Sequence, residues 1–446
     1  MIQDSSVSTN PPTKLVRAIG RWSLVALVIN SVIGSGIFGL PSQLAGLVGR
    51  RSTWVVLFSG LAVGVIMACF AEVASYFTEA GGPYLYARVA FGRLVGIEMG
   101  WMLWLAQLSA PAANANLFVI YVGEFFPRLN EFIPRLATLT LLVAVLFFVN
   151  YRGVRGGTRV NNLFTLAKLL PLTFVIVAGA IYIFIGHHPV SSAVPVTTGA
   201  WLKAVLLMVF AYGGFETALM PMSEARDPRR DAAFSLFIGL VCCIFIYTLV
   251  QWIAVTLLPN AAATSRPLAD ISSLVMGRGG AAIVTIGGLI SFYGYLSAKI
   301  LSVPRLTYAL AETGDFPTIF AAVDPRFRTP FFSILVFAVL VWLLALFGSF
   351  AWNLTLSAVA RLVYYGVGCA ALPVLRRKLP GAALFRLPCG REFSFLGIAI
   401  CAVLLTQVDL SKSLILIATI AIAFVNWLWL RRTPGSSTQK SERVVS

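Results

Sequence analysis

The stretch VALVINSVIGSGIFGLPSQL, residues 25–44, is apolar over a membrane-spanning length and carries glycines in its middle. A second stretch in the other half of the chain, VLLMVFAYGGFETALMPMSEA at residues 205–225, has the same combination. A helix in lipid must satisfy its backbone N–H and C=O groups internally, so an unwound segment at mid-depth persists only where it lines a cavity. Two such breaks at corresponding positions indicate a substrate site of the kind that inverted-repeat transporters use.

The composition is that of a polytopic membrane protein. Of 446 residues, 59% are hydrophobic and only 11% are charged, too few to cover the surface of a soluble protein of this length. Because about 20 apolar residues span the hydrocarbon core of a bilayer, we predict an all-α protein with twelve transmembrane helices. The twelve apolar stretches are 20–48, 53–77, 94–127, 134–151, 159–186, 200–223, 231–258, 278–311, 330–348, 350–375, 393–410 and 412–431.

The two glycine breaks fall in spans 1 and 6, so five spans follow from each break to the end of its half. This spacing predicts a 5+5 inverted repeat with spans 11 and 12 appended and with spans 1 and 6 discontinuous. The predicted segments are a cytoplasmic N-terminal segment 1–19, a transporter domain 20–431 (repeat one 20–186, repeat two 200–375, spans 11 and 12 at 393–431) and a disordered cytoplasmic tail 432–446.

The net charge of +17 reflects topology rather than nucleic-acid binding. Lysine and arginine gather on alternate loops, for example at 152–159 and 376–391, and are sparse on the others. The positive-inside rule therefore places both termini in the cytoplasm, with the basic loops in contact with anionic lipid. We expect a multi-pass protein of the plasma membrane, the inner membrane of a bacterium.

The cysteines and histidines suggest neither a disulfide framework nor a metal site. The six cysteines form no CxxC pair, and the two histidines, His187 and His188, lack acidic or cysteine neighbours. No cofactor is expected. Residues 1–19 are polar and the apolar run after them is too long for the core of a signal peptide, so no cleavable leader is expected.

Gly34-Ser35-Gly36-Ile37-Phe38-Gly39 formally matches the dinucleotide fingerprint GxGxxG, but that fingerprint requires a preceding strand and a βαβ unit. In a membrane span, the helix that resumes after Gly36 instead presents free N–H groups and a positive dipole end, which suit a carboxylate. The alternative is a packing face of small residues, which lets two helices approach closely.

The second break, Phe210-Ala211-Tyr212-Gly213-Gly214-Phe215-Glu216, frees carbonyl groups at the negative end of a half-helix, where they suit an ammonium group. The two breaks together offer complementary ends to an α-amino acid zwitterion. Phe210 and Tyr212 could equally be packing residues. Glu216 is costly inside a membrane and therefore functional by default, with proton transfer and bonding to the broken backbone as the two readings.

Four further charged residues lie inside predicted spans. Lys168 could snorkel to an interface, or serve as a buried ammonium that releases and rebinds a proton and replaces a bound Na⁺. Lys299 could face the cavity or pair with Glu216. Arg361 and Glu72 lie nearer the ends of their spans, where pairing or snorkelling is expected. The loop 224–231, EARDPRRD, is either a salt-bridged latch or ordinary solvated charge.

Five motifs in order resemble amino acid permeases of the APC (amino acid–polyamine–organocation) superfamily. They are GSGIF in span 1, AGGPYLYARVAFG at 80–92, NNLFTLAK at 161–168, FAYGGFE at 210–216 with EARDPRRD at 224–231, and RLTYALAETGDFP at 305–317. The resemblance covers residues 15–431 and implies the leucine-transporter-like fold and secondary transport of amino acids.

The resemblance also implies roles for particular residues. The backbone of Ile33, Gly34, Ser35 and Gly36, with Ile37 beside them, would hold the substrate carboxylate and part of its amine. Carbonyls near Phe210, Gly213 and Gly214 would complete the amine site, and Phe210 matches an aromatic residue that closes over substrate. Lys168 matches a lysine that occupies a sodium position in Na⁺-independent members.

Lys299 departs from the small or aromatic residues often found at its position, and a cation there would disfavour arginine, lysine or agmatine as substrate. We therefore expect Na⁺-independent transport, coupled to protons or to exchange, with neutral and possibly acidic amino acids as substrates and neutral ones favoured. Lys168 and Glu216 are the candidates for proton coupling. The alternatives are an amino-acid sensor or channel without coupled transport and, least favoured, a membrane-embedded enzyme, for which the spans lack a clustered nucleophile and base.

Overall fold

A computed structural model describes residues 20–77, 82–152, 157–186, 197–219 and 227–432, which form helices and no strand. The α-helices are α1 (Arg21–Val32), α2 (Gly36–Val48), α3 (Ser52–Ser75), α4 (Gly82–Phe91), α5 (Arg93–Val122), α6 (Phe132–Tyr151), α7 (Gly157–Phe184), α8 (Thr198–Tyr212), α9 (Phe215–Ala218), α10 (Pro228–Leu257), α11 (Pro267–Glu312), α12 (Phe331–Phe347), α13 (Phe350–Lys378), α14 (Gly390–Leu405) and α15 (Leu410–Arg432). Short 3₁₀ turns lie at Gly49–Arg51, Pro127–Asn130 and Thr318–Ala321.

Eight helical segments in the described ranges are long and apolar enough to cross a membrane, and three shorter apolar ones accompany them. A helix satisfies its own backbone groups, which is why these sequences take that form in lipid. The all-helical, multi-pass architecture predicted from the sequence is confirmed. The count of twelve spans stays a prediction, since α14 has 16 residues and falls short of the length that crosses a bilayer.

Both predicted interruptions are present. Helix α1 ends at Val32 and α2 begins at Gly36, whereas α8 ends at Tyr212 and α9 begins at Phe215. Other boundaries differ from the predicted ones. Helix α11 begins at Pro267 rather than 278, and its first ten residues are set off by Gly277, whose φ of 67° is not helical. Helix α4 lies in a stretch that the sequence analysis left between spans.

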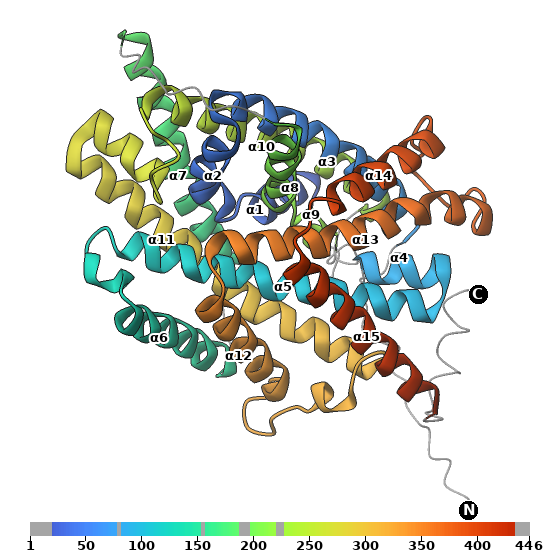
Figure 1. Cartoon of the computed structure of the whole chain (residues 1–446). Coiled ribbons are helices and arrows are strands. Elements are labelled where there is room, and N and C mark those ends of the chain that lie inside the picture. The colour runs from blue at the N-terminus through green and yellow to red at the C-terminus, as the bar shows by residue number, and fades with distance from the viewer. Residues whose placement is uncertain (1–19, 78–81, 153–156, 187–196, 220–226, 433–446) are drawn as a thin grey trace, which may run out of the picture.

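The broken helices lie together at the centre of the upper half of Figure 1, between α10, α3 and α13. Helices α6, α12 and α15 lie on the opposite side of α5 and α11 (Figure 1). Three pairs pack across the two halves of the chain: α3 on α10, α5 on α11, and α6 on α12. Two further contacts match each other between the halves, since α5 packs on α13 and α11 packs on α7.

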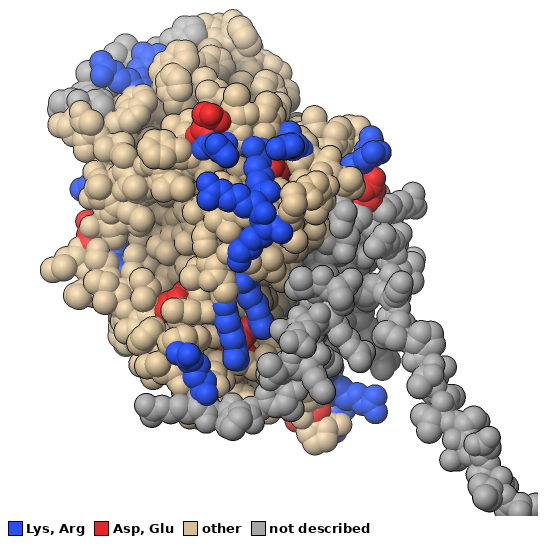
Figure 2. Space-filling view, turned by 90° about the vertical axis from the view of Figure 1, so that its right-hand side faces the viewer, with Lys and Arg blue, Asp and Glu red and all other residues tan. Residues whose placement is uncertain are grey.

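Lysine and arginine gather in a band on the face of the molecule at the right of Figure 1, where α4 and the C-terminal end of α13 lie (Figure 2). Helix α13 ends in Arg376, Arg377 and Lys378. On this side two of the sequence motifs meet: Asp315, which is 1% exposed, pairs with Arg88 of α4 and with Arg93 at 2.8 Å. The motifs at 80–92 and 305–317 therefore hold helices α4, α5 and α11 together.

Glu72, which is fully buried, ties α3 to the end of α13. Its carboxylate accepts two hydrogen bonds from Arg376, both at 2.7 Å, and a third from the backbone N–H of Leu387 at 2.7 Å. Arg376 in turn donates to the Leu387 carbonyl at 2.7 Å. Glu72 is thus paired, one of the two outcomes expected of it, and the segment between α13 and α14 is anchored in the same contact.

Candidate functional site

A small hollow lies between the two helix breaks. Its volume of about 10 Å³ gives room for roughly one water molecule. The hollow is lined by Ser31, Val32, Gly34, Ser35, Gly36, Asn114, Phe210, Ala211, Gly213, Tyr295 and Arg361. An amino acid is larger than this, so the hollow as described has no room for one.

The end of α1 presents its carbonyl groups to Lys168. The lysine Nζ donates to the carbonyl oxygens of Asn30 and Ile33, both at 2.9 Å, and the residue is 4% exposed. A cation is stabilised at the C-terminal end of a helix because the carbonyls there carry partial negative charge. Lys168 therefore points inward to the first break and does not snorkel.

The start of α2 is not capped by the side chain of Ser35, its N-cap residue. The Ser35 hydroxyl is buried and has no hydrogen-bond partner among the described residues. The first N–H groups of a helix have no partner within the helix, so they and the hydroxyl can all donate to an anion at the break. The carboxylate site predicted at Ile33–Ile37 stays a prediction.

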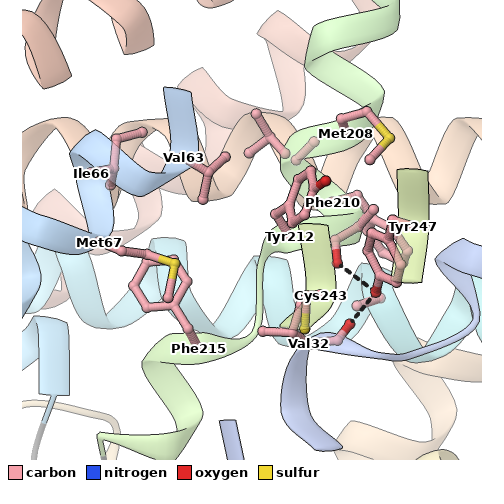
Figure 3. Close-up of a cluster of buried hydrophobic side chains, with 14 of the residues drawn as sticks. Val32, Val63, Ile66, Met67, Met208, Phe210, Tyr212, Phe215, Cys243 and Tyr247 are labelled. Carbon is pink, nitrogen blue, oxygen red and sulfur yellow. Dashed lines mark hydrogen bonds between the residues drawn. The ribbon is translucent and has the colours of Figure 1, made fainter. Parts of the chain in front are cut away.

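One hydroxyl joins the two breaks. The Tyr247 phenol oxygen of α10 lies 3.0 Å from the carbonyl oxygen of Val32 and 3.1 Å from that of Ala211. Figure 3 shows Tyr247 between Val32, at the end of α1, and the end of α8, with dashed lines to both carbonyls. The phenol thus bridges the C-terminal ends of both half-helices.

The second break depends on two glycines. Gly214 has a φ of +109°, and a methyl group added to it would lie 2.3 Å from the Ser31 carbonyl oxygen. A methyl group added to Gly213 would lie 2.0 Å from Nη1 of Arg361. The absence of side chains here lets the two broken segments and an arginine approach one another.

Glu216 is the second residue of α9 and is fully buried in a polar network. It accepts hydrogen bonds from the backbone N–H of Gly214 at 2.9 Å and from the hydroxyls of Tyr364 at 2.8 Å and Tyr365 at 2.9 Å. Its Oε1 lies 3.0 Å from Nη1 of Arg361. Glu216 therefore bonds the broken backbone, as one of its two readings expected, and docks α9 on α13.

Arg361 was expected near the end of span 10, where it would pair or snorkel. It lies instead in the middle of α13, is 2% exposed, lines the hollow and pairs with Glu216. The pairing was correct, but the expected position near a membrane surface was wrong. Residues 361, 364 and 365 share one helix face, which explains why all three reach the same carboxylate.

Lys299 does not pair with Glu216 and does not line the hollow. Its Nζ donates to Oε1 of Gln107 at 2.8 Å and lies 5.3 Å from the centre of the Tyr295 ring. Tyr295, four residues earlier on α11, does line the hollow. Lys299 thus lies behind Tyr295, which separates it from the hollow.

The structure brings many of the expected residues together at the hollow. Of the backbone and aromatic positions expected to bind substrate, Gly34, Ser35, Gly36, Phe210 and Gly213 line it. Ile33, Ile37 and Gly214 adjoin these positions in the chain without lining the hollow, and Glu216, three residues after Gly213, does not line it either. The sequence analysis missed Asn114 and Tyr295, which carry no signal beyond their residue type; for Arg361 the signal was its charge within a span.

A wider pocket of about 350 Å³ lies farther along the same helices. It is lined by Ser42, Gln43, Gly46, Leu47, Lys203, Leu206, Leu207, Ala262, Thr355, Gln407 and Asp409. Ser42 and Thr355 are each six residues from a residue that lines the hollow, which is about 9 Å of helix. At the rim, a hydrogen bond from Lys412 lowers the pKa of the Asp409 carboxyl.

Comparison with known proteins identifies the family. The sequence profile of the family described as amino acid permease matches residues 19–431. The chain is 26% identical to the methylthioribose transporter of Bacillus subtilis (strain 168), over 87% of each chain. It is 26% identical to a branched-chain amino acid permease of the same organism, over 85% of each chain. It is 26% identical to the arginine/agmatine antiporter of Chlamydia pneumoniae, over 77% of this chain and 75% of the antiporter.

The family match covers the broken helices, the hollow and every helix described above. The resemblance to APC permeases noted from five motifs is thereby confirmed. This chain belongs to the amino acid permease family of the APC superfamily.

Proposed function

We propose that this protein is a secondary transporter of amino acids that works by alternating access, rather than an enzyme. The observation that carries the proposal is the pair of interrupted helices facing one hollow. The uncapped start of α2 suits a carboxylate, and the carbonyls of Val32 and Ala211 suit an ammonium group. The transport of amino acids by the relatives supports this assignment.

We infer that the chain is a 5+5 inverted repeat with twelve spans. In such a repeat, each contact between spans has a counterpart after the halves are exchanged. The packing of α5 on α13 corresponds to that of α11 on α7, and the pairs α3–α10, α5–α11 and α6–α12 each map onto themselves. The axis relating the halves would lie in the membrane plane, because each repeat has an odd number of spans.

The wide pocket is the proposed route from the outside. Helices α2, α8 and α13 line both the pocket and the hollow. With the basic face of Figure 2 in the cytoplasm of a bacterium, the pocket opens on the opposite side, and both termini are cytoplasmic. Rocking of the broken helices with α3 and α10 against the rest would then open the hollow to each side in turn.

The proposed coupling is to protons or to exchange, without Na⁺. The ammonium group of Lys168 donates to the carbonyls of Asn30 and Ile33, where it can take the place of a bound Na⁺. Loss of its proton would release both carbonyls and weaken the end of α1. Glu216 is the second candidate for a transferable proton. The positive charges of Lys299 and Arg361 would repel a cationic substrate. The sequence predicts a preference for neutral amino acids.

Uptake of radiolabelled amino acids into proteoliposomes of the purified protein, with and without a pH gradient, tests the proposal. Accumulation or exchange of at least one amino acid is expected, independent of Na⁺. If no amino acid is taken up or exchanged in either condition, the protein is not an amino acid transporter. Binding without uptake would identify a sensor, and currents without accumulation would identify a channel.

A further inference from the structure

Arg361 is the one charged side chain among the described residues that line the hollow. Its side chain is 3% exposed, and it reaches the hollow from α13. Its Nη1 lies 3.0 Å from Oε1 of Glu216 and its Nε donates to the Ser357 hydroxyl at 3.4 Å, but among the described residues Nη1 has no partner with hydrogen-bond geometry. A carboxylate of a ligand in the hollow can accept a hydrogen bond from this nitrogen.

The charges around the hollow do not balance. Three basic side chains are buried near the two breaks: Arg361 lines the hollow, Lys299 lies behind Tyr295, and Lys168 bonds the end of α1. Among the described acidic side chains, Glu216 alone acts on Arg361. The site therefore has an excess of positive charge in surroundings where charges interact more strongly than in water.

A neutral amino acid would not correct this excess. Its ammonium would lie at the carbonyls of the second break, where a methyl group on Gly213 would come within 2.0 Å of the Arg361 guanidinium. Only Glu216 would offset the repulsion between this ammonium and Arg361. An acidic amino acid brings a second carboxylate, which can lie between the two cations and accept from Nη1. Charged hydrogen bonds of this kind are the strong ones, and arginine suits a carboxylate.

We propose, as a refinement that rests on the function proposed above, that Arg361 recognises a carboxylate on the substrate's side chain, so that acidic amino acids are the preferred substrates. The start of α2 takes the α-carboxylate, and Arg361 takes the side-chain carboxylate. This replaces the preference for neutral substrates drawn from the sequence, where Arg361 was expected outside the site.

Binding to the purified full-length protein in lipid nanodiscs, by calorimetry at neutral pH, tests the inference. The probes are glutamate and aspartate against their uncharged counterparts glutamine and asparagine. We expect the acidic member of each pair to bind at least about tenfold more tightly, since a hydrogen bond to a charged group is worth that much. Equal or tighter binding of the uncharged members would overturn the inference.

The variant Arg361→Gln with Glu216→Gln removes the pair as a unit, which avoids leaving a buried charge alone. The glutamate-to-glutamine affinity ratio should fall from about tenfold or more to near one. Arg361→Lys keeps the positive charge but lacks the paired N–H donors of the guanidinium. It should retain part of the glutamate-to-glutamine affinity ratio. Arg305→Gln, an exposed arginine on α11, is the matched control and should leave the ratio unchanged.

A ratio that persists in the double variant would mean that another group selects the substrate. A loss of affinity equal for glutamate and glutamine would mean that Arg361 binds the α-carboxylate instead. Either result overturns the inference while leaving amino acid transport intact. Failure of every amino acid to bind or be transported would instead overturn the proposed function itself.

Discussion

Gly214 carries a backbone conformation that other residues rarely adopt, with φ at +109°. Its Cα also lies so close to α1 that a methyl group would come within 2.3 Å of the Ser31 carbonyl oxygen. The two constraints are independent, because one is intrinsic to the dihedral angle and the other comes from a neighbouring helix. Single residues of this kind fix where the second helix breaks.

Gly214→Ala should destabilise the protein by more than the roughly 1–2 kcal/mol that a left-handed conformation costs, because the clash with Ser31 adds to it. Thermal unfolding in detergent measures the change, and binding should weaken with it. Gly199→Ala is the matched control: it lies on α8, meets nothing within 4 Å and should be neutral or mildly stabilising. Equal melting temperatures of the two variants would contradict the role given to Gly214.

Lys168→Ala should abolish accumulation driven by a pH gradient, because the ammonium that bonds the carbonyls of Asn30 and Ile33 is the proposed proton carrier. Uptake into proteoliposomes with an imposed gradient measures this. Lys378→Ala, an exposed lysine at the end of α13, serves as control and should accumulate substrate as the parent protein does. Undiminished accumulation by the Lys168 variant would remove it from the coupling mechanism.

At the scale of elements, helix breaks were predictable and helix neighbours were not. Glycine clusters in apolar spans placed both interruptions, since local conformational preference decides them. Which side chains face the hollow depends on how each helix is rotated against the others. Asn114 lies on α5, far from either break in sequence, and Tyr295 lies four residues before Lys299, the residue that the sequence analysis chose instead. Tertiary packing therefore decides which side chains line the hollow.

The link between α3 and α13 should be a major element-level contributor to stability. Glu72→Gln would leave Arg376 without its charge partner, and breaking a buried pair of this kind costs about 3–5 kcal/mol. We expect a clear fall in the thermal midpoint. Arg377→Gln, an exposed neighbour, should change stability by less than about 0.5 kcal/mol. A midpoint for the Glu72 variant as high as that of this control would show the contact to be dispensable.

For the whole molecule, the orientation follows from where the basic residues gather and can be tested with a native cysteine. Cys389, between α13 and α14, is exposed on the side proposed as cytoplasmic. A membrane-impermeant maleimide should label it in inside-out vesicles and leave it unlabelled in intact cells. In a Cys389→Ser background, Thr406→Cys, in the turn between α14 and α15, should show the opposite pattern. The reverse result for both would place the termini outside.

The phenol that lies between the two broken helices has one hydrogen to give. The carbonyls of Val32 and Ala211 stand at nearly equal distances from it, 3.0 and 3.1 Å, so they compete for that hydrogen. The carbonyl oxygen that does not accept this hydrogen has both of its lone pairs free, and the one that accepts it still has one. Turning the C–O bond of Tyr247 therefore moves its hydrogen bond from one half-helix to the other without moving a heavy atom.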